Sequence, residues 1–262
     1  MGDKTKIDWA DATWNPVTGC LHGCEYCYAR GIATRFSAEK KERTFIGHCV
    51  NIYKNAPKEL ENPVEVHGRK TAYPFGFAPT LYRYKLDEPK QWKKPRTIFV
   101  CSMADLFGDW IPNEWIAEVF NACLRAPQHI YLFLTKNPKR YIDLMEHGLI
   151  PMEKNFWFGT TTVTPEMEFF FCKTINTFVS VEPIMAPFEN LGENHCAVDW
   201  VIVGAETGRR KGKVIPRKEW IMELSEKCKA DGVPIFMKES LRSIMGDDFK
   251  QEFPWEVHDE NE

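Results

Sequence analysis

The chain has 262 residues, of which 44% are hydrophobic and 27% are charged. This composition is that of a globular protein and excludes a disordered, collagen-like or low-complexity chain. The formal net charge of −3 excludes a general attraction to nucleic acid or anionic membranes, so such a partner would need a local basic patch. No apolar run reaches the roughly 18–20 residues of a membrane span, and the N-terminal segment lacks the apolar core of a signal peptide. We therefore expect a cytoplasmic protein without a membrane partner.

Six short apolar runs follow one another along the chain, with segments of helical length between them. Continuous apolar runs, unlike alternating ones, are typical of strands that are covered on both faces in a parallel sheet. The pattern predicts an α/β fold, a partial or full (β/α) barrel with parallel strands. The expected strands are Thr97–Cys101, Ile130–Leu134, Phe156–Thr160, Thr177–Val181, Trp200–Gly204 and Val233–Met237. The expected helices are Glu114–Leu124 capped by Asn113, Lys139–Glu146 after Pro138, and Lys218–Ala230 between Pro216 and Gly232.

Polar residues follow each of these strands. In α/β barrels the chemistry lies at the carboxyl ends of the strands, which converge on one mouth, so we expect a shared site there. The alternative is that polar residues simply mark the points where strands end. The residues concerned are Ser102, Asp105, Thr135, Lys136, Thr160, Thr161, Thr162, Glu182, Glu206, Lys238 and Glu239.

The predicted barrel occupies residues 1–245 and contains a long insertion at about 38–96. An insertion of that length in a compact domain is usually functional or partly structured. Residues 246–262 form an acidic C-terminal tail, which we expect to be solvated and anchored by Phe253 and Trp255.

Three of the nine cysteines, Cys20, Cys24 and Cys27, form a compact group with the spacing C-x3-C-x2-C. Three thiolates on one short loop can bind three irons of a cubane cluster and leave the fourth iron without a protein ligand. Zinc is the alternative, but a structural zinc site uses four ligands, usually as two close pairs. A second pair would have to come from residues such as His48 and Cys49, at an irregular spacing.

The cysteine spacing and the aromatic Tyr26 resemble the C-x3-C-x-aromatic-C motif of the radical S-adenosylmethionine (SAM) superfamily. In that superfamily the motif follows the first barrel strand, which would be Ala12–Asn15 here. More closely, the chain resembles a phage- and prophage-associated family of radical-SAM-like proteins without an established role. The resemblance covers most of residues 7–240 and is carried by the segments 7–20, 99–108, 180–183 and 200–208.

Two features depart from the pattern of these relatives. Many of them have a longer spacer between the first two cysteines. They also often have Lys-Gln-Trp after the last strand, where this chain has Lys238-Glu-Ser-Leu. From the second departure we expect that the part of the site that contacts the substrate differs from that of these relatives.

The resemblance implies a [4Fe–4S] cluster whose open iron binds SAM. Reductive cleavage of SAM would then give a 5′-deoxyadenosyl radical that abstracts hydrogen from a substrate, with electrons from an external donor such as flavodoxin or ferredoxin. By analogy, Tyr26 would lie near the adenine, and Ser102 and Asp105 would hold the SAM amino group. Asp105 has the alternative of capping the turn that follows it. Ribose or carboxylate contacts are expected from Thr160, Thr162 and Glu182.

Three further residues are candidates for catalysis, each with a structural alternative. Lys136 and Glu206 would point into the barrel mouth, although Lys136 could instead pair with a carboxylate and Glu206 could orient a loop. Cys101, beside Ser102, could donate hydrogen to a product radical, as spore photoproduct lyase is understood to do, or could be a small buried apolar group.

A basic segment that follows the expected strand Trp200–Gly204 would lie at the rim of the mouth. It could bind the phosphates of a nucleotide or nucleic-acid substrate, or it could be a solvated loop. Its basic residues are Arg209, Arg210, Lys211, Lys213, Arg217 and Lys218. Two other functions also remain open: a zinc-binding nucleic-acid-binding module without catalysis, and a barrel that keeps its cluster as a structural or sensing element.

Overall fold

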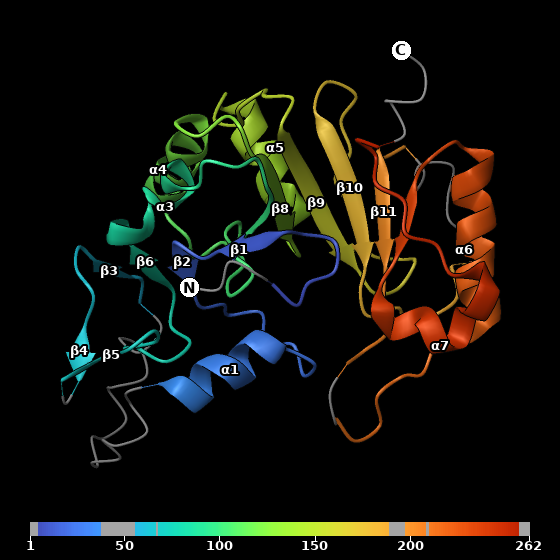
Figure 1. Ribbon diagram of the computed structural model, residues 1–262, viewed down its shortest axis with the longest axis horizontal. Helices are drawn as coiled ribbons and strands as arrows, with labels where there is room; N and C mark the ends of the chain where they lie inside the picture. The colour runs from blue at the N-terminus through green and yellow to red at the C-terminus, as the bar shows by residue number, and fades with distance from the viewer. Residues whose placement is uncertain (1–4, 38–55, 67, 189–196, 208–209, 257–262) are drawn as a thin grey trace.

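The computed structural model describes residues 5–37, 56–66, 68–188, 197–207 and 210–256. Its main element is a seven-stranded, all-parallel sheet in the order β1-β7-β8-β9-β10-β11-β12. The sheet curls into a half-barrel (Figure 1), so the prediction of a partial α/β barrel is confirmed. Its strands are β1 (Ala12–Trp14), β7 (Thr97–Val100), β8 (Ile130–Thr135), β9 (Phe156–Thr162), β10 (Asn176–Val181), β11 (Trp200–Val203) and β12 (Ile235–Met237).

The three predicted helices form where they were expected, as α4 (Asn113–Leu124), α5 (Pro138–Glu146) and α6 (Lys218–Ala230). Asn113 is not the cap of α4: Pro112 holds that position, and the Asn113 amide oxygen accepts a hydrogen bond from Arg140 at 2.7 Å. The segment of helical length between β9 and β10, residues 163–175, contains no helix. The other described helices are α1 (Tyr28–Phe36), α3 (Glu88–Gln91), α7 (Arg242–Met245) and the 3₁₀ turns η2 (Arg83–Lys85), η3 (Glu239–Leu241) and η4 (Gly246–Asp248).

The two faces of the sheet contact different cores, because successive side chains of a strand point to opposite faces. The outer face packs against α4, α5 and α6. The concave face forms an aromatic core of its own, made of Trp9, Phe99, Leu132, Trp157, Phe178, Trp200, Ile202 and Phe236. In β11 the two members of this inner core, Trp200 and Ile202, are two residues apart, as expected for positions that face the barrel interior together.

The described part of the acidic tail closes the amino-terminal end of this inner core. Phe253 and Trp255 pack against Trp200, with ring centroids 5.8 and 5.3 Å from it. The Trp200 indole nitrogen also donates to the backbone oxygen of Glu252 at 2.9 Å. The expected anchoring is therefore present. Of the tail's acids, Asp259, Glu260 and Glu262 lie outside the described residues.

The insertion returns to the segment that leads into the cysteines. Its strand β6 (Thr80–Tyr82) pairs with β2 (Val17–Thr18) and with β3 (Lys58–Leu60), while β4 (Glu65–Val66) and β5 (Arg69–Lys70) form a separate hairpin. The next residue after β2, Gly19, has a φ of +93°, and a Cβ there would lie 2.2 Å from the Ala78 oxygen. Only glycine fits this close approach, which fixes the start of the cysteine loop.

Among the described residues, no helix has both the length and the apolar character that crossing a membrane requires.

Replacing Gly159 with Ala tests the inner core. Gly159 lies in β9 beneath the fully buried Phe178, and a Cβ would lie 2.2 Å from its ring. We expect a loss of about 1–3 kcal/mol of unfolding free energy in chemical denaturation, because the packed ring cannot move aside. Gly31→Ala, at an exposed helical position with nothing within 4 Å, is the control and should be neutral or stabilising. Equal stability of wild type and Gly159→Ala would contradict this account of the packing.

Candidate functional site

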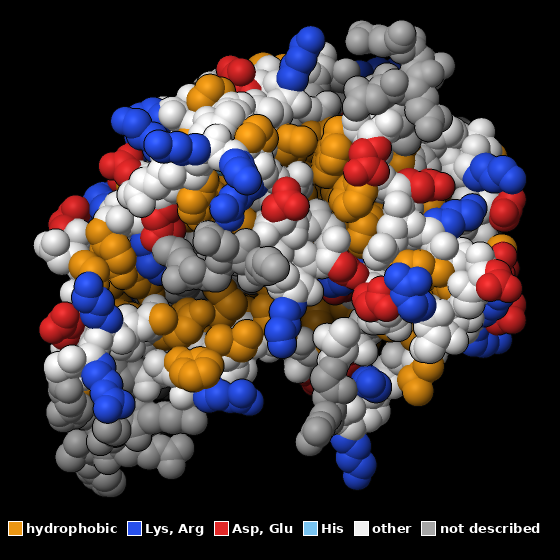
Figure 2. Space-filling model, in the orientation of Figure 1, with side chains coloured by type: hydrophobic (Ala, Val, Ile, Leu, Met, Phe, Trp, Pro, Cys, Tyr) orange, Lys and Arg blue, Asp and Glu red, His pale blue; other side chains and the backbone are white. Residues whose placement is uncertain are grey.

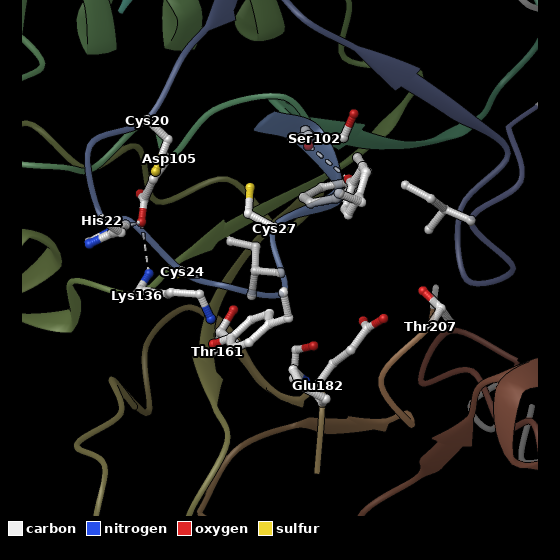
Figure 3. Close-up of a pocket in the computed structure, with 18 of the residues that line it drawn as sticks. Cys20, His22, Cys24, Cys27, Ser102, Asp105, Lys136, Thr161, Glu182 and Thr207 are labelled. Atoms are coloured by element: carbon white, nitrogen blue, oxygen red, sulfur yellow. Dashed lines mark hydrogen bonds and ion pairs between the residues drawn. The ribbon is translucent and has the colours of Figure 1, made fainter. Parts of the chain in front are cut away.

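A pocket opens at the carboxyl ends of the strands, as expected for a barrel of this kind. It encloses about 1070 Å³ out to its open mouth, a volume that includes space open to solvent. Figure 3 shows residues from the cysteine loop and from several strand ends facing the same space. Those that carry the argument are Cys20, His22, Cys24, Tyr26, Cys27, Ser102, Asp105, Lys136, Thr161, Ser180, Glu182, Glu206 and Lys238.

The three cysteines of the predicted cluster site line this pocket from one loop. All three are free thiols. The Cys27 sulfur caps α1 by accepting the Arg30 backbone N–H at 3.4 Å, and the Arg30 guanidinium donates to the Cys20 oxygen at 3.0 Å. Helix α1 therefore holds both ends of the loop. Burial raises the pKa of the Cys20 thiol to about 12, so the thiol holds its proton at neutral pH. Binding of a metal would release that proton, because the metal ligand is the thiolate.

The donor set of the loop fits an iron–sulfur cluster in kind, since three thiolates are the ligands such clusters use. Among the described residues, no three His, Cys, Asp or Glu side chains are arranged so that they could hold a metal ion. Zinc needs ligands that converge on one ion, whereas the cysteines of a cubane bind different irons. His48 and Cys49, the candidates for a second zinc pair, lie outside the described residues.

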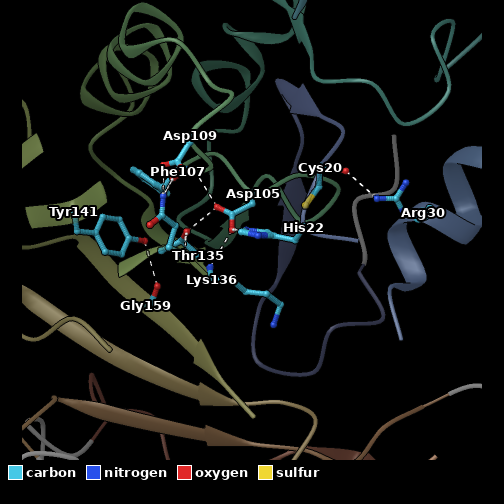
Figure 4. A network of polar contacts seen from close by, with 11 residues as sticks. Cys20, His22, Arg30, Asp105, Phe107, Asp109, Thr135, Lys136, Tyr141 and Gly159 are labelled. Carbon is cyan, nitrogen blue, oxygen red and sulfur yellow. Dashed lines mark hydrogen bonds and ion pairs between the residues drawn. The ribbon is translucent and has the colours of Figure 1, made fainter. Parts of the chain in front are cut away.

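Asp105 is the most heavily bonded side chain at the pocket edge (Figure 4). Its Oδ1 accepts from the Phe107 backbone N–H at 3.1 Å and from the Thr135 hydroxyl at 2.7 Å. Its Oδ2 accepts from the Lys136 backbone N–H at 2.9 Å and from His22 Nε2 at 2.7 Å. Four donors fill the acceptor sites of a carboxylate. Asp105 thus bonds to the turn that follows it, which is the structural alternative named above. With all four acceptor sites used, it has none left for the SAM amino group.

Ser102 lines the pocket but is also tied to its surroundings. Its hydroxyl donates to Asn15 Oδ1 at 3.2 Å, and its backbone oxygen accepts from the Tyr28 hydroxyl at 2.8 Å. Tyr26 lines the pocket as well, and the Lys136 ammonium lies 5.4 Å from the centre of its ring. Burial lowers the pKa of Lys136. The structure therefore brings together the predicted residues Ser102, Tyr26 and Lys136 beside the cysteines.

The predicted Thr160 and Thr162 are not at the pocket surface, and Thr161 between them is. Thr160 is fully buried, and its hydroxyl accepts the Phe170 backbone N–H at 3.1 Å. Thr161 shares the face of Trp157 and Gly159, and its partner across the sheet is Ser180, which also lines the pocket. The expectation failed because a strand buried on both faces shows no alternation from which its inner positions can be identified.

Two of the carboxylates that line the pocket, Glu182 and Glu206, are held in ion pairs. Glu182 pairs with Lys238, so the carboxylate that the resemblance assigned to SAM is already bonded. Glu206 makes a bidentate pair with Arg210, at 2.7 Å for each bond, and this contact holds the Glu206 pKa below its usual range. Arg210 also lies 3.6 Å from Glu25 of the cysteine loop. Glu206 thus orients Arg210 of the loop after β11, which is the structural role named above as the alternative to catalysis.

The comparisons with known proteins give a family without an assigned role. A family model described as "Protein of unknown function (DUF5131)" matches residues 4–245. The chain belongs to this family. No curated protein and no solved structure matches the chain.

In this family member the basic rim is partly neutralised. Besides the Arg210 pair, Lys218 bonds to Asp248 at 2.5 Å, and the Arg217 guanidinium lies 5.1 Å from the Trp220 ring centre. Lys211 is exposed, and Arg209 lies outside the described residues.

Cys101 does not line the pocket. Its side chain is buried in the outer core, and burial raises its pKa to about 12. Its φ of +59° is the only positive value among the described residues other than glycine. The structure therefore gives Cys101 the packing role that the sequence left as its alternative.

Sequence reasoning did not assign roles to His22 and Lys238. Both are polar residues next to recognised motifs: His22 lies inside the cysteine spacing, and Lys238 directly follows β12. Their partners, Asp105 and Glu182, are distant in the sequence, so the pairs could be found only from the fold.

Replacing Asp105 with Asn tests the bonds that hold the cysteine loop to the sheet. The amide nitrogen cannot accept from two of the four donors, so we expect a loss of about 2–4 kcal/mol in chemical denaturation and faster hydrogen exchange in the loop. Asp109→Asn is the matched control, because its one hydrogen bond, from the Asn137 side chain, can still be accepted by an amide oxygen. Similar stabilities of the two variants would refute the role of Asp105.

Replacing Glu206 with Gln tests the Arg210 pair through its pH dependence. Because the folded pKa of Glu206 is lowered, the pair stabilises the protein above the unfolded pKa of about 4.3. This contribution is lost as pH falls through the folded pKa. The Tm of Glu206→Gln should therefore lie below that of wild type at pH 7, with the gap closing toward about pH 3. A gap that stays constant with pH, or an equal effect of the exposed control Glu226→Gln, would contradict this.

Proposed function

We propose that this protein is a radical SAM enzyme in which Cys20, Cys24 and Cys27 hold a [4Fe–4S] cluster. The observation that supports the proposal most is that these three thiols, on one loop, line a pocket at the carboxyl edge of a parallel half-barrel. When bound, the reduced cluster and SAM supply a 5′-deoxyadenosyl radical that abstracts hydrogen from a substrate.

The pocket wall suits reactive chemistry because much of it is apolar. Trp9, Phe99, Leu134 and Ala205 line it together with the stems of the charged residues, and such a wall keeps water from a reactive intermediate. The Ser180 hydroxyl lines the pocket, is fully buried and has no hydrogen-bond partner among the described residues. Together with the neighbouring Thr161 hydroxyl, it offers a ligand a polar contact on an otherwise dry face.

The proposal includes an external one-electron donor such as a flavodoxin or ferredoxin. It also includes a substrate of nucleotide or nucleic-acid type, for which Lys211 and Arg217 at the rim could bind phosphate. Arg210 and Lys218 could bind phosphate only after their ion pairs with Glu206 and Asp248 had opened.

The test starts with iron, zinc and acid-labile sulfide in protein purified without oxygen. Wild type should contain about four irons with sulfide per chain, and should form 5′-deoxyadenosine from SAM and dithionite. Cys20→Ala, Cys24→Ala and Cys27→Ala should each lose the cluster and the product, since each removes a ligand. Cys172→Ala, outside the pocket, is the control and should retain both.

Zinc without sulfide in wild type would reject the proposal and favour the zinc-binding module. A cluster that never yields 5′-deoxyadenosine would instead favour a structural or sensing role.

A further inference from the structure

The cysteine loop has a second, outward-facing side. Cys24 and Cys27 line the main pocket and also a shallow surface groove, together with Glu25 of the cysteine loop and Arg30, Gly31, Thr34 and Arg35 of α1. Two of the proposed cluster ligands are thus accessible from the protein surface as well as from the pocket.

Helix α1, which begins directly after Cys27, is unusually exposed for a helix of a globular protein. Only Ala29 and Ala33 are buried, and its other residues are all exposed. Tyr28, Ile32 and Phe36, spaced by four residues, form an apolar stripe along one face, with 54, 37 and 60% of their surface exposed. We call this stripe, together with the groove, the α1 face.

Helix α1 is also basic, since it carries Arg30 and Arg35 and no acidic residue. Glu25, the acidic residue of the groove, lies 3.6 Å from Arg210. Figure 2 shows hydrophobic and basic side chains gathered around α1. An apolar stripe on a basic helix suits a partner of opposite charge.

We propose that the α1 face docks an acidic one-electron carrier protein, which passes its electron to the cluster through the side where Cys24 and Cys27 reach the surface. The inference rests on the proposed function. In the step, the carrier is oxidised by one electron, the cluster is reduced by one electron, and no bond forms or breaks. Electron transfer slows steeply with distance, so a carrier needs a surface that borders the cluster ligands, and the α1 face does so.

The size of the face fits this kind of partner. A helix of nine residues offers a small contact area, and weak redox encounters bury less than about 1,200 Å² in total. Such encounters depend on charge complementarity for their association rate, and salt weakens them.

The experiment measures binding and turnover separately, with an oxidised flavodoxin and an oxidised ferredoxin as probes for titration calorimetry. Arg35→Glu and Ile32→Ser alter the charge and the apolar stripe, while Lys229→Glu and Ile142→Ser make the same changes on exposed positions of α6 and α5. At least one probe should bind wild type, with salt-sensitive affinity. Its Kd should weaken about tenfold in the two α1 variants and remain unchanged in the two controls.

Turnover then distinguishes docking from chemistry. With dithionite, all four variants should form 5′-deoxyadenosine as wild type does, whereas with the reduced carrier the two α1 variants should be slower by about the factor lost in binding. If dithionite supports product but neither probe binds, or if the α1 variants bind like the controls, the docking inference is wrong and the proposed function stands. If a loaded wild type gives no product with dithionite, the proposed function itself fails. A wild-type dimer that the α1 variants convert to monomers, with carrier binding unchanged, would assign the face to a second copy of the chain.

Discussion

The site depends on one buried carboxylate. Asp105, which is 5% exposed, joins three segments that are far apart in the sequence: its own turn after β7, the end of β8 through Thr135 and Lys136, and the cysteine loop through His22. A carboxylate in this position is costly unless all of its acceptors are used, and here they are. The bonded state is therefore strongly favoured, and it fixes where the cysteine loop stands relative to the mouth of the half-barrel.

Further contacts hold the loop from other directions. The insertion contributes Ala78, whose backbone leaves room only for glycine at position 19. The loop after β11 contributes Arg210, which lies between Glu206 and Glu25. A residue of the loop after β11 and a residue of the insertion thus converge on one short loop, although they lie far apart in the sequence. This explains why an insertion of such length is built onto β2, the strand directly before the cysteines.

The apolar runs and helix-start signals, which are local properties, were sufficient to predict six of the seven strands of the main sheet and the three main helices. The first strand, β1, was expected only from the resemblance, and the strands β2 to β6 were not predicted. The sequence also placed Lys136, Glu182 and Glu206 at the mouth, since these residues directly follow strands. It could not show which threonine of β9 faces inward, because every residue of that strand is buried. The face of Thr161 becomes clear only from its neighbours in the inner core. The sequence also could not show that all acceptor sites of Asp105 are used, because the donors that bond to them come from three separate segments.

The same contacts divide the cysteine loop into two sides with different properties. On the inner side, Asp105, Lys136 and the ion-paired Glu182 and Glu206 belong to a packed wall whose polar groups are largely bonded. Among the described residues, Ser180 is a buried group there that is still free to bond a ligand. On the outer side, α1 is attached to the molecule mainly through Ala29 and Ala33, which pack against Met103, and presents the rest of its surface to solvent. Small side chains allow the helix to lie close to the body of the protein while its arginines and apolar residues stay exposed. Because His22 and Asp105 hold the loop from within, its cysteines can stay in place while a partner binds to and leaves the exposed side, where Arg30 is the α1 residue that also bonds to the loop.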